Sequence, residues 1–156
     1  MAIEKVRAYL KALGMEDRIH EPEASTATVE LAAAAIGTEP ARIAKTLSFR
    51  SDDGCILIVA AGDTRIDNKK FKQTFGMKAR MLSPEEVEEF TGHTIGGVCP
   101  FAIEREDVKV YLDDSLKRFE TIFPAAGSSR SMVELSCDEL YTAGHALGWV
   151  DVCKYA

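Results

Sequence analysis

A glycine- and proline-containing loop at residues 94–101, with the sequence TIGGVCPF, is the stretch best suited to chemistry. Two adjacent glycines, Gly96 and Gly97, allow positive φ angles and let another group approach the backbone amides closely. Pro100 fixes its own φ angle and favours an extended conformation for Cys99 before it. Such a stiff loop with free N–H groups could hold a carbonyl oxygen, a phosphate or a carboxylate. The alternative interpretation is a tight connection between a helix and a strand.

A lysine on an otherwise apolar strand face is the second feature. Residues 42–50 alternate as a strand does, so Lys45 shares a face with Ile43 and Leu47. Its amine must either reach solvent at a sheet edge or be held in a cleft. A turn at residues 127–130, with the sequence GSSR, is the third feature.

These three segments could meet in one cleft. A lysine neutralises a phosphate or a developing oxyanion, and glycine amides hold a carbonyl oxygen. Together they would suit a substrate that carries an acyl group close to a phosphate. Taken singly, each has an ordinary explanation, with Lys45 as an edge-strand lysine, Gly127 as a turn residue and Arg130 as a surface cation.

Length and composition indicate one ordinary globular domain. The chain has 156 residues, of which 46% are hydrophobic and 28% charged. It holds no apolar run long enough to cross a bilayer, and its first residues lack the apolar core of a signal peptide. We therefore expect a cytoplasmic protein with no membrane partner.

The charge is unevenly spread along the chain. The formal net charge of −6 argues against a protein that coats nucleic acid, so no DNA partner is expected. Residues 42–80 hold nine basic and four acidic residues, a net +5, which leaves −11 for the remainder. A basic segment on an acidic body fits docking of one end of a polyanion, although such segments are often solvated faces.

The cysteines and histidines predict neither a metal site nor a disulfide framework. Cys55, Cys99, Cys137 and Cys153 form no C-x-x-C pair, and the three histidines share no metal-ligand spacing. We expect reduced thiols and no metal or cofactor. Cys99 remains a candidate nucleophile because of its place in the loop, although no nearby base is evident.

Apolar periodicity predicts the elements that must position these segments. Helical spacing and capping residues predict helices at 2–13, 28–36, 67–75, from a capping box at 83–86 to about residue 92, and from a second capping box at 136–139. Alternation predicts strands at 18–20, 42–50, 55–61, 78–82, 108–112, 120–124 and 132–135, with a hairpin turn at 51–54 and a short helix starting near 113. No strict βαβ rhythm appears. We expect the α/β (α+β) class, with a single domain over residues 1–156 and a mixed central β-sheet surrounded by helices.

Four motifs occur in a recognisable order: Ala44-Lys45-Thr46-Leu47, Gly96-Gly97-Val98-Cys99-Pro100-Phe101, Leu112-Asp113 and Ala126-Gly127-Ser128. In order and spacing they resemble the YbaK-type aminoacyl-tRNA deacylases, relatives of the editing domain inserted in bacterial prolyl-tRNA synthetase. The resemblance extends from the first helix to Leu140. Its most specific part is the lysine strand together with the G-x-x-x-P loop.

This resemblance implies hydrolysis of the ester that joins a wrong amino acid to the 3′-terminal adenosine of a tRNA, most directly a proline tRNA. It implies that Lys45 engages the terminal nucleotide and that Gly96 and Gly97 align the carbonyl for attack by water. Family members rely on substrate groups, such as the ribose hydroxyls or a cysteine thiol. The implied substrate-binding residues are His20, Thr46, Val98, Cys99, Pro100, Phe101, Asp113, Gly127 and Ser128. For Asp113, a helix N-cap at a strand end is an equal alternative.

Several alternatives stay open at this point. Some family members carry a tyrosine soon after the position of His20, and some have Gly-Lys-Arg-Gly where this chain has residues 127–130. The edited amino acid is therefore open among cysteine, alanine and other small side chains. A module that binds an aminoacyl-tRNA or nucleotide without hydrolysing it is the alternative function. Prolyl-tRNA synthetase is a candidate partner that the sequence neither requires nor excludes.

Overall fold

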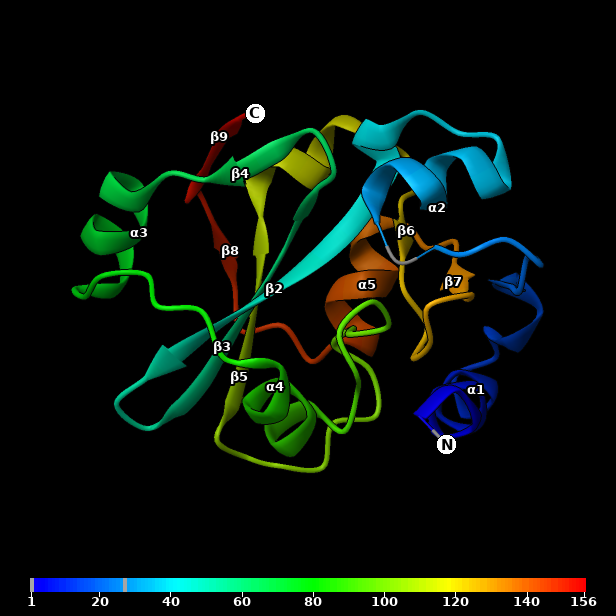
Figure 1. Ribbon diagram of the computed structural model, residues 1–156, viewed down its shortest axis with the longest axis horizontal. Helices are drawn as coiled ribbons and strands as arrows, with labels where there is room; N and C mark the ends of the chain where they lie inside the picture. The colour runs from blue at the N-terminus through cyan, green and yellow to red at the C-terminus, as the bar shows by residue number, and fades with distance from the viewer. Residues whose placement is uncertain (1, 27) are drawn as a thin grey trace.

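The fold is built around β3 (Gly54–Ala61), which contains the most apolar stretch of the chain (Figure 1). In the computed structural model, which describes residues 2–26 and 28–156, every residue from 55 to 61 is buried. Leu57 and Val59 face one hydrophobic cluster, whereas Ile56 and Ile58 face another. A strand buried on both faces needs this continuous apolar composition, and the prediction of a central strand is confirmed.

The central sheet is mixed, as predicted. Its strand order is β6 (Phe123–Pro124), β2 (Ile43–Ser51), β3, β5 (Val108–Asp113) and β8 (Trp149–Val150). β2 and β3 are antiparallel, and the pairing of Ser51 with Gly54 leaves the predicted hairpin turn at residues 52–53. The pairs β2–β6, β3–β5 and β5–β8 are parallel.

Helices cover both faces of the sheet, which confirms the α+β class. α1 (Ala2–Ala12), α4 (Pro84–Thr91) and α5 (Cys137–Ala143) place buried side chains in the larger cluster. α3 (Asn68–Phe75) packs Phe71 into the cluster on the opposite face. α2 (Val29–Ile36) packs two buried alanines beside β2 and β6. None of the helices in the described ranges is long and apolar enough to cross a bilayer.

The predicted helix boundaries follow the capping residues. Ser83 and Ser136 each form a capping box, with Glu86 and Glu139 respectively. These reciprocal hydrogen bonds satisfy backbone groups that a helix N-terminus otherwise leaves without partners. The predicted short helix after β5 is the 3₁₀ turn η3 (Asp114–Arg118). Two other 3₁₀ turns, η1 (Glu16–Arg18) and η2 (Pro40–Arg42), precede strands.

The predicted strand at residues 78–82 is wrong. Met81 forms only an isolated bridge with Phe49, supported by hydrogen bonds from Arg50 N to Arg80 O and from Leu82 N to Ser48 O. Only these residues lie close enough to the edge of β2 to pair with it. The segment is therefore a connection that touches the sheet at one end.

Other strands are shorter than predicted or were not predicted. The predictions at 18–20, 120–124 and 132–135 shrink to the two-residue strands β1 (Ile19–His20), β6 and β7 (Met132–Val133). The small pair of β4 (Thr64–Ile66) and β9 (Cys153–Tyr155) was not predicted, and neither was β8. Each forms through pairing with a distant segment, which leaves little local signal.

Candidate functional site

A cleft lies along the edge of β2 that faces away from β3. β6 pairs with β2 only at Ile43 and Ala44, and the next pairing on that side begins at Ser48. Within the described residues, no strand covers positions 45–47 on that edge. The resulting cleft has a volume of about 250 Å³ and is lined by Thr26, Thr28, Val29, Ala32, Ile43, Ala44, Lys45, Thr46, Leu47, Ser48, Met81, Leu82, Val87, Ile95, Gly96, Val98, Phe123, Ala125 and Met132.

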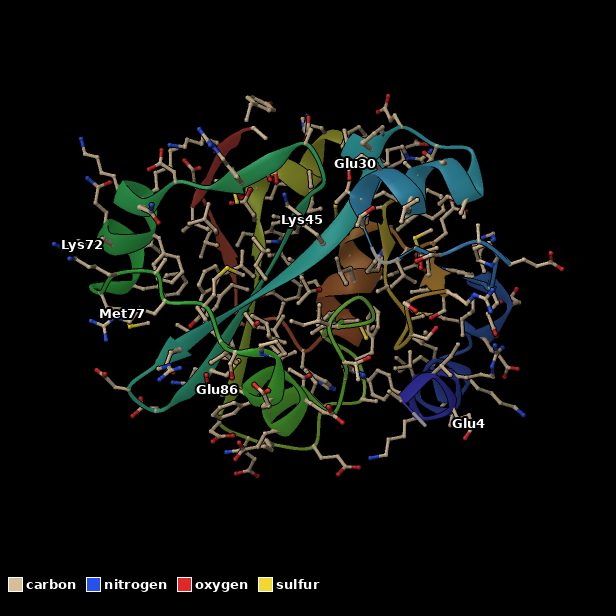
Figure 2. The ribbon with its side chains drawn as sticks, viewed as in Figure 1. Glu4, Glu30, Lys45, Lys72, Met77 and Glu86 are labelled. Carbon is tan, nitrogen blue, oxygen red and sulfur yellow. The ribbon has the colours of Figure 1, made fainter. Side chains whose placement is uncertain are left out.

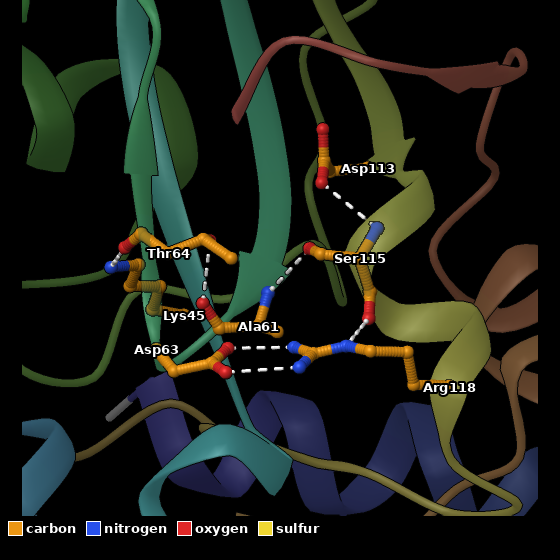
Figure 3. Close-up of polar contacts among 7 residues, drawn as sticks. All are labelled: Lys45, Ala61, Asp63, Thr64, Asp113, Ser115 and Arg118. Atoms are coloured by element: carbon orange, nitrogen blue, oxygen red, sulfur yellow. Dashed lines mark hydrogen bonds and ion pairs between the residues drawn. The ribbon is translucent and has the colours of Figure 1, made fainter. Parts of the chain in front are cut away.

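Lys45 is the one charged residue in this described lining. Its half-buried amine donates a hydrogen bond to the backbone oxygen of Thr64, at the start of β4 (Figures 2 and 3). Burial lowers the pKa of Lys45, because desolvation disfavours the charged form. An ammonium group carries three N–H donors, so two remain for a ligand.

A chain of hydrogen bonds holds the turn that receives Lys45 (Figure 3). The Thr64 hydroxyl donates to Ala61 O at 2.7 Å, and the Ala61 amide donates to the Ser115 hydroxyl at 3.1 Å. Arg118 forms a two-point pair with Asp63, at 2.9 and 2.6 Å. The turn between β3 and β4 is therefore fixed from two sides, which fixes the acceptor of the Lys45 amine.

Asp113 belongs to this support. It is the N-cap of η3, and its two carboxylate oxygens accept from the amides of Ser115 at 2.9 Å and Val152 at 3.0 Å. The side chain is buried and does not line the cleft. The N-cap interpretation of Asp113 is therefore confirmed.

Two threonine hydroxyls in the cleft have no hydrogen-bond partner. Thr26 is 7% exposed and Thr46 is 9% exposed, and both line the cleft. Their Oγ1 atoms are buried without a donor or acceptor among the described residues. A buried hydroxyl without a partner costs stability, so both positions favour a ligand that supplies one.

The 94–101 loop forms one wall of the cleft through Ile95, Gly96 and Val98. Gly96 has φ +97°, in the region that favours glycine. The expectation of free amides holds only in part, because the Gly97 amide donates to Thr94 O at 3.0 Å within the turn. In the described chain, the amides of Gly96 and Val98 have no such partner. Together with the amide of Ile95, which has no such partner either, they are the donors that the lining residues of the loop can offer to an oxygen.

The other half of the loop packs against the 127–130 turn. A Cβ on Gly97 would lie 2.6 Å from the Ser128 backbone, so only glycine allows this approach. Gly127 has φ +97° and packs on α1, where a Cβ would meet Ala2 and Val6 at 2.9 Å. The two predicted glycine segments therefore meet, with their backbones in contact behind the cleft.

Cys99 is buried and lies next to His93, a neighbour that no sequence pattern predicted. The Cys99 sulfur lies 3.5 Å from His93 Nε2, and the same nitrogen lies 2.8 Å from Phe101 O. A carbonyl oxygen only accepts, so Nε2 carries the proton and cannot act as a base toward the thiol. Burial raises the pKa of Cys99 to about 12, which keeps the thiol protonated. The geometry does not fit a cysteine nucleophile.

Of the residues implied by the family resemblance, Lys45, Thr46, Gly96 and Val98 line the cleft. His20 lies beside it, with its ring 6.2 Å from that of the lining residue Phe123. The others lie behind the cleft or away from it; they are Gly97, Cys99, Pro100, Phe101, Asp113, Gly127 and Ser128.

Sequence reasoning missed the residues that complete the cleft. Thr26 lies in a polar turn that suggested only N-cap candidates, and the N-cap of α2 is Thr28. Met81 and Ile95 are 62% and 60% exposed apolar side chains at the rim. Large apolar residues exposed beside a cleft often contact a ligand, but only a structure identifies them as exposed.

The described lining contains no carboxylate, imidazole or thiol. A catalytic triad or a protein general base would need one of these groups within hydrogen-bond reach of the reacting atoms. The cleft can instead offer one cation, amides of the 94–101 loop and the unpartnered hydroxyls of Thr26 and Thr46 around a mainly apolar space. Such a site positions a substrate and stabilises negative charge, while any proton transfer involves substrate groups or water.

Comparison with protein families gives one match that covers most of the chain. The model of the aminoacyl-tRNA editing domain matches residues 23–143. A protein of Bacillus subtilis (strain 168), named as the uncharacterized protein YwhH, is 56% identical over 155 residues, which is 99% of this chain and 98% of that protein. The match therefore extends over both chains almost end to end.

The names of two further matches mention proline–tRNA ligase or prolyl tRNA synthetase. The proline–tRNA ligase of Bacillus licheniformis is 29% identical over 114 residues, which is 72% of this chain but 19% of the ligase. A solved structure described as a candidate trans-editing enzyme for prolyl tRNA synthetase superposes with a TM-score of 0.88. It is 31% identical, and the superposition covers 98% of this chain and 97% of that structure.

Proposed function

The chain belongs to the aminoacyl-tRNA editing domain family, as its motifs predicted, and on this premise we propose that it is a free-standing deacylase. Its substrate is a mischarged tRNA, in the first place proline tRNA that carries cysteine, alanine or another small amino acid. The reaction is hydrolysis of the ester at the 3′-terminal adenosine. The observation that carries the proposal is the cleft, where a cation, free amides and unpartnered hydroxyls line one space.

In this proposal, Lys45 contacts the terminal nucleotide. Two of its N–H groups are available, and the Thr64 carbonyl fixes the third. The apolar surroundings strengthen its attraction for a phosphate or a polarised oxygen, because the local dielectric constant is low. Lys45 is thus a positioning and charge-neutralising group rather than a base.

The loop amides stabilise the reacting carbonyl. A water molecule attacks the carbonyl carbon, and negative charge develops on the carbonyl oxygen in the tetrahedral intermediate. The amides of Gly96 and Val98 can donate to this oxygen. The bond from the carbonyl carbon to the ribose oxygen then breaks, and the proton released by water passes to the leaving ribose oxygen through substrate hydroxyls. No protein base is needed, in agreement with the described lining of the cleft.

Thr26 and Thr46 contact polar groups of the aminoacyl end. Each hydroxyl can both donate and accept, so together they can hold an ammonium group or a polar side chain. The surrounding Val29, Ile43 and Phe123 limit the size and polarity of the rest of that group.

The test is a deacylation screen over a panel of mischarged tRNAs, with Lys45→Ala as the variant and Lys11→Ala as its control. Lys11 is an exposed lysine on α1, outside the cleft. The wild type and the control should accelerate the loss of at least one ester. Lys45→Ala should be at least about 100-fold slower, by analogy with removal of one charge-stabilising group. Its circular dichroism spectrum should remain that of the wild type.

Two results would contradict this proposal in different ways. Wild-type hydrolysis by Lys45→Ala would remove Lys45 from the mechanism. Protection of every ester by the wild-type protein, relative to buffer, would identify a binding module instead of a hydrolase.

A further inference from the structure

The 94–101 loop, which forms one wall of the cleft, is held at both ends by one buried histidine. His93 is 1% exposed, and its Nε2 atom donates a hydrogen bond to the backbone oxygen of Phe101 at 2.8 Å. This bond joins the residue just before the loop to the last residue of the loop. We call it the closing hydrogen bond.

The backbone of His93 is itself fixed to the end of α4. Its amide donates to the hydroxyl of Thr91 at 3.1 Å, and that hydroxyl donates to Val87 O within the helix at 2.6 Å. On the loop side, the sulfur of Cys99 also lies against Nε2, at 3.5 Å. The loop therefore cannot shift relative to α4 without breaking the closing hydrogen bond or leaving the ring.

We propose that His93 is a positioning residue for deacylation, whose neutral ring keeps Gly96 and Val98 on the wall of the cleft. This inference rests on the proposed function and adds a control of the loop by proton binding at one buried group. Both residues lie between the two ends that the closing hydrogen bond joins. Without that bond, the segment from Gly96 to Phe101 is free to move, and the amides no longer meet the carbonyl oxygen in a fixed geometry.

The second ring nitrogen of His93 makes this control sensitive to pH. Nδ1 is buried and has no hydrogen-bond partner among the described residues. A proton there would create a charged N–H group without an acceptor, so burial lowers the pKa of His93 below its ordinary value of 6.5. The neutral ring therefore prevails at pH 7. At lower pH, the protonated ring is favoured outside its buried place, where water accepts from Nδ1, and the closing hydrogen bond is lost.

The charged groups around the ring do not favour its protonated form. The titratable neighbours come from four segments: Lys5 of α1, Glu89 of α4, Cys99 of the loop, and Glu104 and Arg105 beyond it. Each of the two carboxylates pairs with a cation, Glu104 with Lys5 at 3.1 Å and Glu89 with Arg105 at 3.7 Å. The charge of Lys5 lowers the pKa of His93 further. These residues and His93 line a cavity of about 100 Å³, which has room for the water that brings a proton to the ring.

NMR tests the closing hydrogen bond without any substrate. Proton–nitrogen correlation spectra of the histidine side chains report which ring nitrogen carries the proton and at which pH each ring titrates. At pH 7, His93 should have its proton on Nε2, and its titration midpoint should lie below 6.5. A proton on Nδ1, or a midpoint at or above 6.5, would overturn the inference.

Two substitutions separate the hydrogen bond from the bulk of the ring. His93→Phe keeps an aromatic ring but loses the donor, whereas His93→Gln keeps an N–H donor at a similar reach and cannot titrate. His93→Phe should lower kcat about tenfold, the value of one hydrogen bond, and leave KM unchanged, because the amides act on the oxygen of the transition state. His93→Gln should retain kcat within about threefold of the wild type. Equal kcat in His93→Phe and the wild type would contradict a positioning role.

The pH profile is the measurement that a merely structural role would not change. After subtraction of spontaneous hydrolysis, wild-type kcat should fall with acid at the midpoint that NMR gives for His93. His93→Gln should lack this fall. His145→Asn, which removes an exposed histidine at φ +51°, a region that Asn tolerates, should keep it. The same fall in His93→Gln as in the wild type would overturn the inference, even if His93→Phe does not fold.

A failure of the proposed function would instead appear as wild-type protein that hydrolyses no ester. The hold of His93 on the loop is then decided by hydrogen exchange of the Gly97 amide, which donates to Thr94 O inside the loop. This amide should exchange at least about tenfold faster in His93→Phe than in the wild type, because one hydrogen bond is lost. Equal exchange in the two proteins would show that His93 does not position the loop.

Discussion

The polar groups on the two sides of Lys45 differ in how they are satisfied. On the side of the β3–β4 turn, Asp113 uses both carboxylate oxygens, and the Thr64 hydroxyl donates to a backbone carbonyl. On the cleft side, the hydroxyls of Thr26 and Thr46 are also buried but have no partner within the described residues. Polar groups that the protein satisfies itself hold its shape, whereas those left without partners favour a ligand. The groups on the side of the β3–β4 turn therefore support the site, whereas those on the cleft side belong to its binding surface.

The largest expected effect on stability comes from removing Asp113, on the side where the polar groups have hydrogen-bond partners. Asp113→Ala leaves the half-buried amide of Ser115 and the buried amide of Val152 without acceptors, so it should lower the free energy of unfolding by about 3 kcal/mol. Urea unfolding measures this change. Asp113→Asn keeps one carbonyl oxygen and should lose about half as much. A loss below about 0.5 kcal/mol in Asp113→Ala would show that the network is not a support.

A smaller and opposite effect is expected on the cleft side. Thr46→Val removes a buried hydroxyl without a partner, so the free energy of unfolding should stay equal or rise by up to about 1 kcal/mol. Deacylation should nevertheless slow by about tenfold, the value of one hydrogen bond to the substrate. Urea unfolding and single-turnover kinetics check the two statements.

Thr64→Val is the matched control for this variant. Its hydroxyl donates to Ala61 O, so the same substitution should lower the free energy of unfolding by about 1 kcal/mol. If the two variants were equally destabilised, the Thr46 hydroxyl would have a partner in the free protein, and the comparison would fail.

The smallest effect concerns the pair of Asp63 and Arg118, whose side chains are each 33% exposed. Hydrogen bonds from Arg118 hold the pKa of Asp63 below its ordinary value of 3.8. The pair therefore stabilises the fold above that pH, and its contribution is lost as the pH falls through the folded-state pKa. After solvent screening, Arg118→Gln should cost less than about 1 kcal/mol at pH 7.

This pH dependence can be checked by thermal unfolding. The difference between the wild type and Arg118→Gln should be constant from pH 7 to 5 and should shrink below pH 4. A difference that persists unchanged at pH 2.5 would mean that Arg118 acts through its bond to Ser115 O instead.

The elements that local chemistry determines could be predicted from the sequence. The capping boxes at Ser83 and Ser136 predicted two helix starts, and the apolar run of β3 predicted the sheet centre. Residues 78–82 show the limit, because alternation alone does not say whether a partner strand runs alongside. The C-terminal strands β8 and β9 are defined by pairing with β5 and β4, which no local pattern encodes.

The candidate site was predictable where motifs carried it. Lys45 and Gly96 stand in motifs shared with a known family, and both line the cleft. Thr26 could not be found in this way, because its importance comes from burial without a partner, a property of the folded chain. Cys99 and Phe101 share the loop motif, but they hold the loop against His93 from behind.

The uncovered edge of β2 has a consequence for engineering this protein. The cleft occupies the place that a longer β6 or a longer 80–82 bridge would fill with backbone hydrogen bonds. Substitutions that extend either neighbour across positions 45–47 should therefore give a more heat-resistant molecule in which the cleft is closed. The cleft occupies the position of a missing strand, and selection for thermostability alone would tend to restore that strand.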